Sequence, residues 1–383
     1  MADTRAAQLR RLWLNVHLWI GVGIAALLVP ISLSGALLVW HDEIDAWINP
    51  HRYAVTGTEV ARPVSTYLAK AAEAVAKDPT NLRATIMRYP EKGWPVRITM
   101  RGQSRDAGAR PRVITVFLDP PTAAVLDVME FRSSFFGFLH VFHENLTIPE
   151  YSGRQIVGWV GTGLLIMSLT GLWLWWPRSG GFLRGLRWTR SGRFTINLHH
   201  LIGFWISIPL AVVSFTGIYL AFPQTARNAM STVAPMGPPR GGFGGQIAQH
   251  TTLAVDRAVD IAHKSAPNAE PTALFLPVQQ RGEANVNWRV EMRGRDNAFT
   301  VTVDDQSGQA KVVAPQSGDR AAAWIRWIHE GSHSGPLWAA IVFLTGIFPS
   351  VFAVTGIMMW LRKRSDRRAR NARTAEAQLR PAE

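Results

Sequence analysis

Cysteine is absent from this 383-residue chain. Its absence excludes disulfide bonds, thiolate metal sites, iron–sulfur clusters and covalent haem attachment through a Cys-x-x-Cys-His motif. Acidic residues are also few, because 27 Asp and Glu stand against 41 Lys and Arg, which gives a formal charge of +14. Such a basic chain suggests a nucleic-acid partner only when its charge gathers on a folded surface. The position of the charges therefore decides how the excess is interpreted.

Four long segments contain no charged residue at all. Residues 17–40, 155–177, 197–222 and 336–361 lack Asp, Glu, Lys and Arg and are rich in Leu, Ile, Val, Phe and Trp. About 20 apolar residues cross the hydrocarbon core of a bilayer, so each segment predicts a transmembrane helix. The first segment is too long for the apolar region of a signal peptide and lacks a small-residue cleavage site. The predicted fold class is therefore an α-helical membrane protein with four spans.

Most of the net positive charge lies in three short segments. Residues 1–16, 178–196 and 362–383 hold 16 Lys and Arg against 4 acids, a net +12 of the total. The positive-inside rule places these segments, with both termini, on the cytoplasmic side of the bacterial inner membrane. Residues 41–154 and 223–335 would then lie in the periplasm. The charge excess thus predicts topology and contact with anionic lipid headgroups, and it does not predict a nucleic-acid partner.

The two halves of the chain repeat each other. The pattern Asn-x-His-x-x-x-Gly occurs at residues 15–21 and 197–203, and a Ser-Gly or Thr-Gly pair ends 14 residues after each pattern. The second and fourth uncharged segments match as well, because Thr-Gly leads to Trp at residues 170–175 and 355–360. We expect a duplicated two-helix unit whose copies run in the same direction about a pseudo-twofold axis along the membrane normal. The Ser-Gly and Thr-Gly pairs predict close helix packing.

Both expected periplasmic segments show one helical pattern followed by strand-like runs. Residues 64–78 and 252–265 are expected to be helical. The expected strands are residues 83–89, 95–101 and 112–128 in the first segment and 273–279, 285–293 and 298–313 in the second. The sequence therefore predicts two small α+β modules. The Gly- and Pro-rich residues 231–246 are expected to form a loop on the same side of the membrane.

Four histidines occupy matching positions in the two halves. His17 and His199 lie at the cytoplasmic ends of the first and third spans, and His143 and His329 precede the second and fourth. Histidine in or beside a membrane span is costly and usually functional. Two imidazoles that face each other across a twofold axis are arranged to hold a flat macrocycle through its iron. The four histidines predict two b-type haem sites, one near each membrane face.

Two glycines support the first of these sites. Gly21 and Gly203 lie one helical turn after His17 and His199. Because glycine has no side chain, a porphyrin plane could approach the helix closely at these positions. We therefore expect Gly21 and Gly203 to pack against the macrocycle.

Neighbouring histidines leave the choice of ligands open. The alternatives are His200, His140 and His333. Consecutive helical residues point about 100° apart, so only one of His199 and His200 can face the partner, and the repeat favours His199. His140 lies three residues before His143, and His333 lies four residues after His329. Such spacings could also hold a bare metal ion on a helix face.

The combination of four spans, paired His-x-x-x-Gly motifs, Thr-Gly…Trp helix ends and two α-β-β-β modules resembles the PepSY-associated transmembrane family. The Ile-His-Glu-Gly sequence at residues 328–331 is similar to that family's Leu-His-Thr-Gly element. Within the family, the chain most resembles the inner-membrane siderophore reductases of the ferrioxamine type, over roughly residues 10–365. The resemblance implies a di-haem enzyme that reduces ferric siderophore in the periplasm, with the same four histidines as axial ligands.

The source of electrons is not encoded by a recognisable motif. We find no dinucleotide fingerprint, P-loop or flavin motif, so a quinol or a cytoplasmic carrier is the expected donor. Three other functions stay open: a quinol-linked cytochrome subunit serving a periplasmic partner, a siderophore or metal permease, and a regulatory binding protein. Four spans are few for a permease, and a regulatory protein would not require duplicated membrane histidines.

Overall fold

The chain forms two compact parts. The computed structural model describes residues 2–91, 93–102, 111–177, 182–187, 191, 193–237, 246–248, 250–279, 286–294 and 298–379. The helical part comprises Met1–Trp40, Leu139–Ala229 and Ala322–Glu383. The sheet part comprises His41–Phe138 and Met230–Ala321. Both parts therefore combine segments from the two halves of the sequence.

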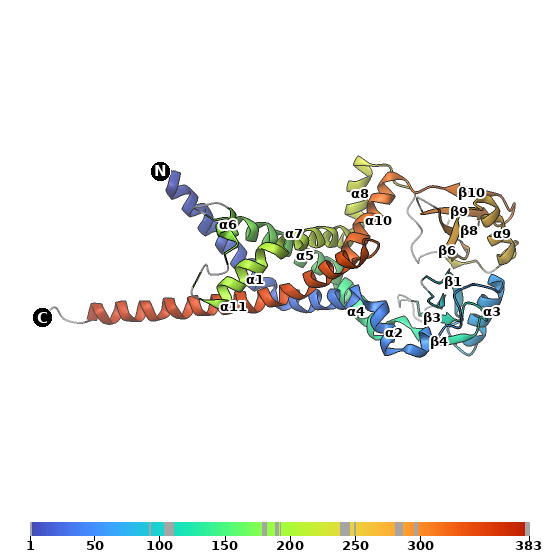
Figure 1. The fold of residues 1–383 in the computed structure, drawn as a ribbon, viewed down its shortest axis with the longest axis horizontal. Coiled ribbons are helices and arrows are strands. Elements are labelled where there is room, and N and C mark those ends of the chain that lie inside the picture. Colours follow the sequence, from blue (N-terminus) through green and yellow to red (C-terminus); the bar gives the residue numbers. More distant parts are fainter. Residues whose placement is uncertain are drawn as a thin grey trace. The chain divides into compact units, whose positions relative to one another are not determined.

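Four long helices form the centre of the helical part (Figure 1). They are α1 (Ala2–Val39), α5 (Gly153–Trp175), α7 (Phe194–Ala221) and α11 (Gly335–Leu379). Each contains a stretch long and apolar enough to cross a membrane. Contacts run from α1 to α5, from α5 to α7, from α7 to α11 and from α11 back to α1. The four predicted helices are thus confirmed, and they pack in a ring. Their length and apolar character fit an α-helical membrane protein.

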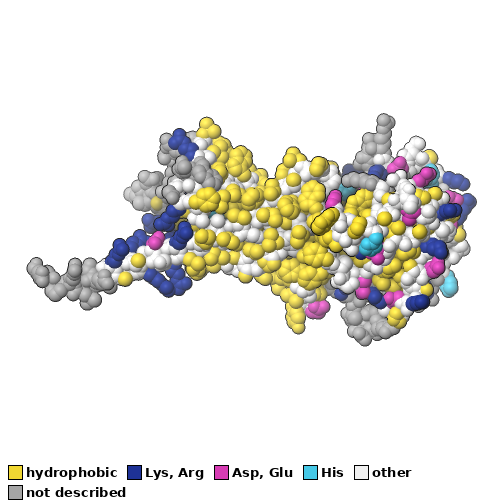
Figure 2. Space-filling model, turned by 60° about the horizontal axis from the view of Figure 1, so that its bottom comes forward, with side chains coloured by type: hydrophobic (Ala, Val, Ile, Leu, Met, Phe, Trp, Pro, Cys, Tyr) yellow, Lys and Arg dark blue, Asp and Glu magenta, His cyan; other side chains and the backbone are white. Residues whose placement is uncertain are grey.

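The surface of the helical part matches this assignment. Exposed hydrophobic side chains cover the long helices, and Lys and Arg side chains gather along the end of α11 (Figure 2). Trp19, Trp159 and Trp205 are more than half exposed although they belong to long apolar helices. A water-soluble protein rarely exposes apolar patches of this extent, so these side chains face lipid.

Two helices continue beyond the predicted spans. Residues 1–16 were expected to precede the first span, but α1 already begins at residue 2. Residues 362–383 were expected to follow the last span, but α11 continues to residue 379. Charged side chains end an apolar span without ending a helix, because Arg, Lys and Ala all have high helix propensity. The helices α5 and α7 differ from the predicted spans by only one to three residues at each end.

Shorter helices connect and cover these elements. They are α2 (His41–Ile48), α3 (Val64–Ala74), α4 (Phe135–Asn145), α6 (Phe182–Gly185), α8 (Pro223–Val233), α9 (Val255–Ser265) and α10 (Ser317–Glu330), with the 3-10 turns η1 (Pro50–Tyr53), η2 (Phe131–Ser133) and η3 (Pro149–Tyr151). Helices α4 and α10 lead into α5 and α11. The sequence did not separate these two helices from the modules predicted for residues 41–154 and 223–335.

Two predicted connecting segments are only partly described. The basic segment 178–196 contains α6, and its residues 178–181, 188–190 and 192 lie outside the described residues. The predicted loop 231–246 begins inside α8, and its residues 238–245 also lie outside the described residues. The loop prediction is therefore wrong for residues 231–233, which are helical.

The strands of both segments join into one antiparallel sheet. They are β1 (Arg83–Arg88), β2 (Val96–Arg101), β3 (Val113–Leu118), β4 (Val125–Glu130), β6 (Glu270–Phe275), β8 (Asn287–Arg293), β9 (Ala298–Asp304) and β10 (Ala310–Val313), in the order β10-β9-β8-β6-β1-β2-β3-β4. Strands β5 (Gln246–Ile247) and β7 (Val278–Gln279) form a separate pair. The structure thus differs from the two separate modules predicted, because β1 pairs with β6 with Met87 opposite Leu274.

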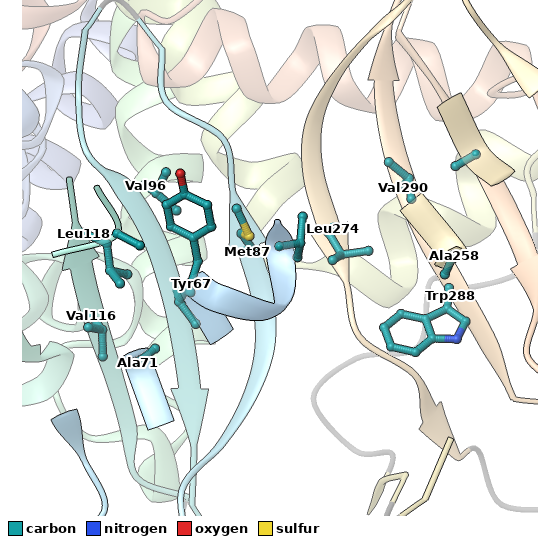
Figure 3. Close-up of a cluster of buried hydrophobic side chains, with 14 of the residues drawn as sticks. Tyr67, Ala71, Met87, Val96, Val116, Leu118, Ala258, Leu274, Trp288 and Val290 are labelled. Atoms are coloured by element: carbon teal, nitrogen blue, oxygen red, sulfur yellow. The ribbon is translucent and has the colours of Figure 1, made fainter. Parts of the chain in front are cut away.

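The core of the sheet part lies between the sheet and the helices α3 and α9 (Figure 3). Strand β2 shows the two-residue period of a half-buried strand, because Val96, Ile98 and Met100 are fully buried and the residues between them are partly exposed. Tyr67 of α3 and Trp288 of β8 are also buried in this core. Each large apolar side chain removed from water contributes roughly 2 kcal/mol, so this continuous core stabilises the joined sheet.

Two buried carboxylates occupy equivalent positions in the two halves of the sheet part. Asp119, which is 1% exposed, accepts hydrogen bonds from the Thr56 backbone N–H and hydroxyl, both at 2.7 Å. Asp305, which is 4% exposed, accepts from the Thr252 N–H at 2.7 Å and from the Trp288 Nε1–H at 2.8 Å. Each carboxylate follows the end of a strand and holds the chain segment that leads toward α3 or α9.

Candidate functional site

A cavity of about 300 Å³ lies inside the ring of long helices. Its walls include His17, Gly21, Gly171, His199, Gly203 and Gly356. Aromatic and aliphatic side chains supply most of the remaining lining, in the proportion usual for cofactor pockets. The structure therefore brings His17 and His199, called the span pair below, to one cavity together with the two glycines predicted to accompany them.

Threonine hydroxyl groups hold both imidazoles of the span pair. His17 Nδ1 lies 3.0 Å from Thr170 Oγ1, and His199 Nδ1 lies 2.9 Å from Thr355 Oγ1. Each hydroxyl donates its own proton to the carbonyl four residues earlier in its helix, at 2.7 and 2.8 Å. The hydroxyl oxygen must therefore accept the Nδ1–H of the imidazole. Nε2 is then the unprotonated nitrogen of each ring and is suited to bind a metal.

Glycines next to these threonines lie beside the rings. A Cβ atom added to Gly171 would lie 3.4 Å from His17 Cε1, and one added to Gly356 would lie 4.0 Å from His199 Cε1. Both distances are ordinary contacts, so the rings lie against the backbone of the neighbouring helix. A flat macrocycle next to the imidazoles would use the same lack of side chains.

The two glycines predicted to pack against a macrocycle have different surroundings. Nothing lies within 4 Å of the position that a Cβ of Gly203 would take, so this glycine opens into the cavity. A Cβ at Gly21 would lie 2.9 Å from the terminal methyl of Met167. A porphyrin could therefore approach the helix directly at Gly203. At Gly21 it could do so only after the flexible Met167 side chain changes its rotamer.

His143 of α4 and His329 of α10 form a second pair, called the connector pair below. Their ring centroids lie 6.3 Å apart, and the ring planes are inclined by 39°. Two imidazoles bound on opposite sides of one metal ion, with bonds of about 2 Å, have ring centres about 6 Å apart. The observed spacing therefore fits one metal ion between the two rings.

Backbone carbonyls fix the protonation of the connector pair. His143 Nδ1 lies 2.9 Å from the carbonyl of residue 31 and 3.2 Å from Ser34 Oγ. His329 Nδ1 lies 3.0 Å from the carbonyl of residue 213 and 3.2 Å from Thr216 Oγ1. A carbonyl only accepts, so Nδ1 carries the proton and Nε2 is unprotonated. Burial lowers the pKa of both imidazoles, and that of His329 falls to about 4, so both rings are neutral at physiological pH.

Glycine is required beside the connector pair. A Cβ atom at Gly35 would lie 2.6 Å from His143 Cε1, and one at Gly217 would lie 2.9 Å from His329 Cε1. Real side chains do not approach this closely, so any residue other than glycine would displace the ring. These two positions therefore define where each imidazole lies.

The sequence did not reveal the role of the hydroxyl groups. The Ser-Gly and Thr-Gly pairs were assigned to helix packing, but in each pair the hydroxyl bonds one of the four histidines. The pairs are Ser34-Gly35, Thr170-Gly171, Thr216-Gly217 and Thr355-Gly356. All four hydroxyl residues are buried, at 3–8% exposure. The repeat contained the signal, but spacing within one helix does not show which residue of another helix it meets.

The alternative ligands have different surroundings. His140 Nε2 lies 3.9 Å from a carboxylate oxygen of Glu144, and the His333 ring stacks on Trp327 with centroids 4.4 Å apart. His200 lines the same cavity as the span pair and stays an alternative there. Among the described residues, no group of three His, Cys, Asp or Glu side chains is arranged to hold a bare metal ion.

Comparison with known families agrees with the architecture. The sequence matches the family described as the PepSY-associated TM region over residues 14–363. The match begins within α1, ends within α11 and includes α5, α7 and the residues of the sheet part. No curated protein sequence matches the chain. The chain belongs to the PepSY-associated transmembrane family.

Proposed function

We propose that this protein is a di-haem electron-transfer protein of the bacterial inner membrane that reduces ferric siderophores in the periplasm. The observation that carries the proposal is that the Nδ1 atoms of both imidazole pairs lie within hydrogen-bond distance of oxygen atoms, which leaves Nε2 as the metal-binding nitrogen of each ring. A b-type haem held by one such pair supplies reversible one-electron transfer. The span pair and the connector pair would each hold one haem through their Nε2 atoms.

The spacing along the helices supports a route across the membrane. His17 and Ser34 lie 17 residues apart on α1, and His199 and Thr216 lie 17 residues apart on α7. Because an α-helix rises about 1.5 Å per residue, the two residues on each helix lie about 25 Å apart. The hydrocarbon core is about 30 Å thick, so the two pairs lie near its opposite faces.

The hydrogen bonds also support a duplicated two-helix unit. Each bond between a hydroxyl and an imidazole joins two residues of the same half of the chain. Each pair then combines one imidazole from either half, as a pseudo-twofold axis requires. By the positive-inside rule, the basic segments favour cytoplasmic termini and a periplasmic sheet part. In this orientation the span pair lies on the cytoplasmic side.

An apolar groove supports a quinol as the electron donor. The groove, of about 650 Å³, is lined by Leu201, Ile202, Trp205, Ile206, Ile208, Pro209 and Val212 of α7 and by Trp338, Ile341, Leu344 and Phe348 of α11. Phe348 stacks on Phe352 at 6.4 Å, and Phe352 contacts the His199 ring at 5.1 Å. The isoprenoid tail of a quinol matches this lining, and the aromatic rings connect the groove to the span pair.

The reaction balances with these partners. Each ferric siderophore accepts one electron, which converts Fe(III) to Fe(II). Hydroxamate oxygens are hard ligands that bind Fe(II) less strongly, so the iron is released. One quinol loses two electrons and two protons and reduces two ferric siderophores. The chain itself holds the imidazoles and provides the apolar enclosure.

Visible spectroscopy tests the cofactor. We expect the protein, purified in detergent from haem-replete cells, to contain two b haems per chain by pyridine haemochrome assay. His17→Ala and His143→Ala should each lose about one haem. His263→Ala replaces an exposed imidazole of α9 and should keep both. Folded wild-type protein without haem would contradict the proposal and favour the permease.

Mixing experiments test the substrate. Protein reduced anaerobically and mixed with ferrioxamine B should be reoxidised, and one ferrous ion should be trapped by a ferrous chelator for each electron delivered. His143→Ala should lose this reaction because the haem on the periplasmic side is missing. Protein that contains both haems but does not reduce the ferric siderophore would favour a cytochrome subunit that serves a periplasmic partner.

A further inference from the structure

The hydrogen-bond acceptors of His199 differ from those of the connector pair. His199 donates its Nδ1–H to the Thr355 hydroxyl at 2.9 Å. His329 divides its Nδ1–H between the carbonyl of Val213 at 3.0 Å and the Thr216 hydroxyl at 3.2 Å. The same division holds for His143. The hydroxyl is therefore the principal acceptor at His199 and a shared acceptor in the connector pair.

We infer that Ser34, Thr170, Thr216 and Thr355 are positioning residues that select the metal-binding tautomer of the four histidines and tune the haem held by each pair. The inference rests on the proposed function for its redox part, but the tautomer can be measured without haem. Thr355 is expected to have a larger influence than Thr216, because His329 keeps a carbonyl acceptor when the hydroxyl is removed.

The orientation of each hydroxyl explains how it selects a tautomer. Thr355 Oγ1 donates to the Val351 carbonyl at 2.8 Å, so its proton points along its own helix. Only its lone pair faces His199. A ring with its proton on Nε2 would place two lone pairs against each other. Removing the hydroxyl leaves a buried N–H unsatisfied and allows the ring to rotate or to move its proton to Nε2.

Hydroxyl groups in membrane helices often bond only their own backbone. Thr345 donates to the Val342 carbonyl at 2.6 Å, and Thr162 donates to the Gly158 carbonyl at 2.9 Å. Among the described residues, neither hydroxyl has a hydrogen bond to one of the four histidines. They are matched controls, because Thr345 shares α11 with Thr355 and Thr162 shares α5 with Thr170.

The tuning follows from the basicity of the ligand. Donation of Nδ1–H to an oxygen makes Nε2 more basic, which stabilises ferric iron relative to ferrous iron and lowers the midpoint potential. Loss of such a partner typically lowers metal affinity about 10- to 100-fold. We therefore expect Thr355→Val to raise the midpoint potential of one haem and to increase its dissociation by this factor.

Holo-protein variants test this part of the inference. Midpoint potentials come from spectroelectrochemical titration, and haem dissociation is followed by transfer to apomyoglobin. Thr355→Val should shift the haem of the span pair, and Thr355→Ser should restore wild-type values. Thr216→Val should shift the other haem less, and Thr345→Val should shift neither. Equal values for Thr355→Val and Thr345→Val would overturn the inference.

The apo-protein separates this inference from the proposed function. Full-length protein with 15N-labelled histidine, prepared without haem, should show Nδ1–H tautomers for the four imidazoles by NMR. Thr355→Val should change the nitrogen shifts of one ring, and Thr345→Val should change none. If wild-type protein binds no haem but shows these tautomers, the proposed function fails and the hydroxyl assignment stands. Nε2–H tautomers in wild-type protein would overturn the assignment.

Discussion

The sheet part and the helical part use buried polar groups in different ways. In the sheet part, Asp119 and Asp305 accept hydrogen bonds from backbone N–H groups and from the Trp288 indole. In the helical part, buried hydroxyls such as Thr170 and Thr355 accept from imidazole nitrogens. The carboxylates satisfy groups that the fold itself buries. The hydroxyls orient imidazole rings, and the Nε2 atom of each ring stays available to bind a metal.

This difference distinguishes structural from functional polar groups within one chain. A buried group that satisfies the backbone contributes mainly to stability, and its loss is expected to unfold its surroundings. A buried group that orients a ligand nitrogen contributes mainly to binding, and its loss is expected to change the site before it changes the fold. Hydrogen exchange resolved by peptide reports the first property, and haem content reports the second, so both can be measured on the same sample.

The largest expected effect is the removal of the Asp305 carboxylate. Asp305→Ala leaves the Thr252 N–H, the Leu253 N–H and the Trp288 indole N–H without their acceptor. We expect a loss of about 4 kcal/mol in the stability of the sheet part. Hydrogen exchange should accelerate in β8 and β9, and haem content should stay unchanged. Loss of haem without faster exchange in the sheet would contradict the assignment of Asp305 to stability.

The next effect concerns a buried cation. Arg52 is 7% exposed and its guanidinium lies 2.6 Å from an Asp45 oxygen and 2.7 Å from an Asp127 oxygen. Arg52→Met keeps much of the side-chain volume but removes the cation that the two carboxylates share. We expect a loss of about 3 kcal/mol, seen as faster exchange in β4. A partial recovery in the triple variant with Asp45→Asn and Asp127→Asn would confirm the electrostatic cause.

A pair of glycine substitutions tests the helical part. Gly35→Ala places a Cβ 2.6 Å from His143 Cε1, whereas Gly203→Ala meets nothing within 4 Å. We expect Gly35→Ala to weaken haem binding at the connector pair by about 100-fold, the upper end expected for loss of a ligand's support. Gly203→Ala should leave the connector pair unchanged. Wild-type rates of hydrogen exchange in the sheet part of both variants would show that the glycine substitutions affect the helical part alone.

The smallest expected effect is a pH dependence of the sheet part. Burial alone would raise the pKa of Asp119, but hydrogen bonds from Thr122 and Thr56 outweigh burial and lower it. The unfolded carboxyl titrates at about 3.9. The stabilisation is therefore fully present above this pH and is lost as the pH falls through the lower folded pKa. Urea unfolding measured at pH 5 and at several lower pH values should show full stabilisation at pH 5 and a loss below about 3.9 in wild type, with less loss in Asp119→Asn.

Much of the fold followed from the sequence because its cause is local. Uncharged length predicted the four spans, and alternation predicted most of the strands. The joining of β1 to β6 was not predictable, because it pairs residues almost 190 positions apart whose register no local pattern specifies. The ends of α1 and α11 were missed for another reason. Hydropathy predicts where an apolar span ends, but the charged residues beyond that point still favour a helix, so α1 and α11 continue past their spans.

The candidate site was predictable only at the level of residue type. Repetition identified His17, His199, His143 and His329, and the structure brings them together in two pairs. The partners of their Nδ1 atoms were not predictable, because each lies on another helix whose rotation the sequence does not give. The spacing of the hydroxyls within the repeat becomes meaningful only after the helices are placed side by side.

The helix α1 carries both His17 and Ser34, so the length of helix between these two residues is fixed. One inserted residue between them would turn Ser34 by about 100° and move it by about 1.5 Å relative to His17. Either the cavity or the connector pair would then lose its contact with α1. The same holds for α7 between His199 and Thr216. Substitutions on the lipid-facing side of these two helices are therefore tolerable, whereas single-residue insertions and deletions within them are not.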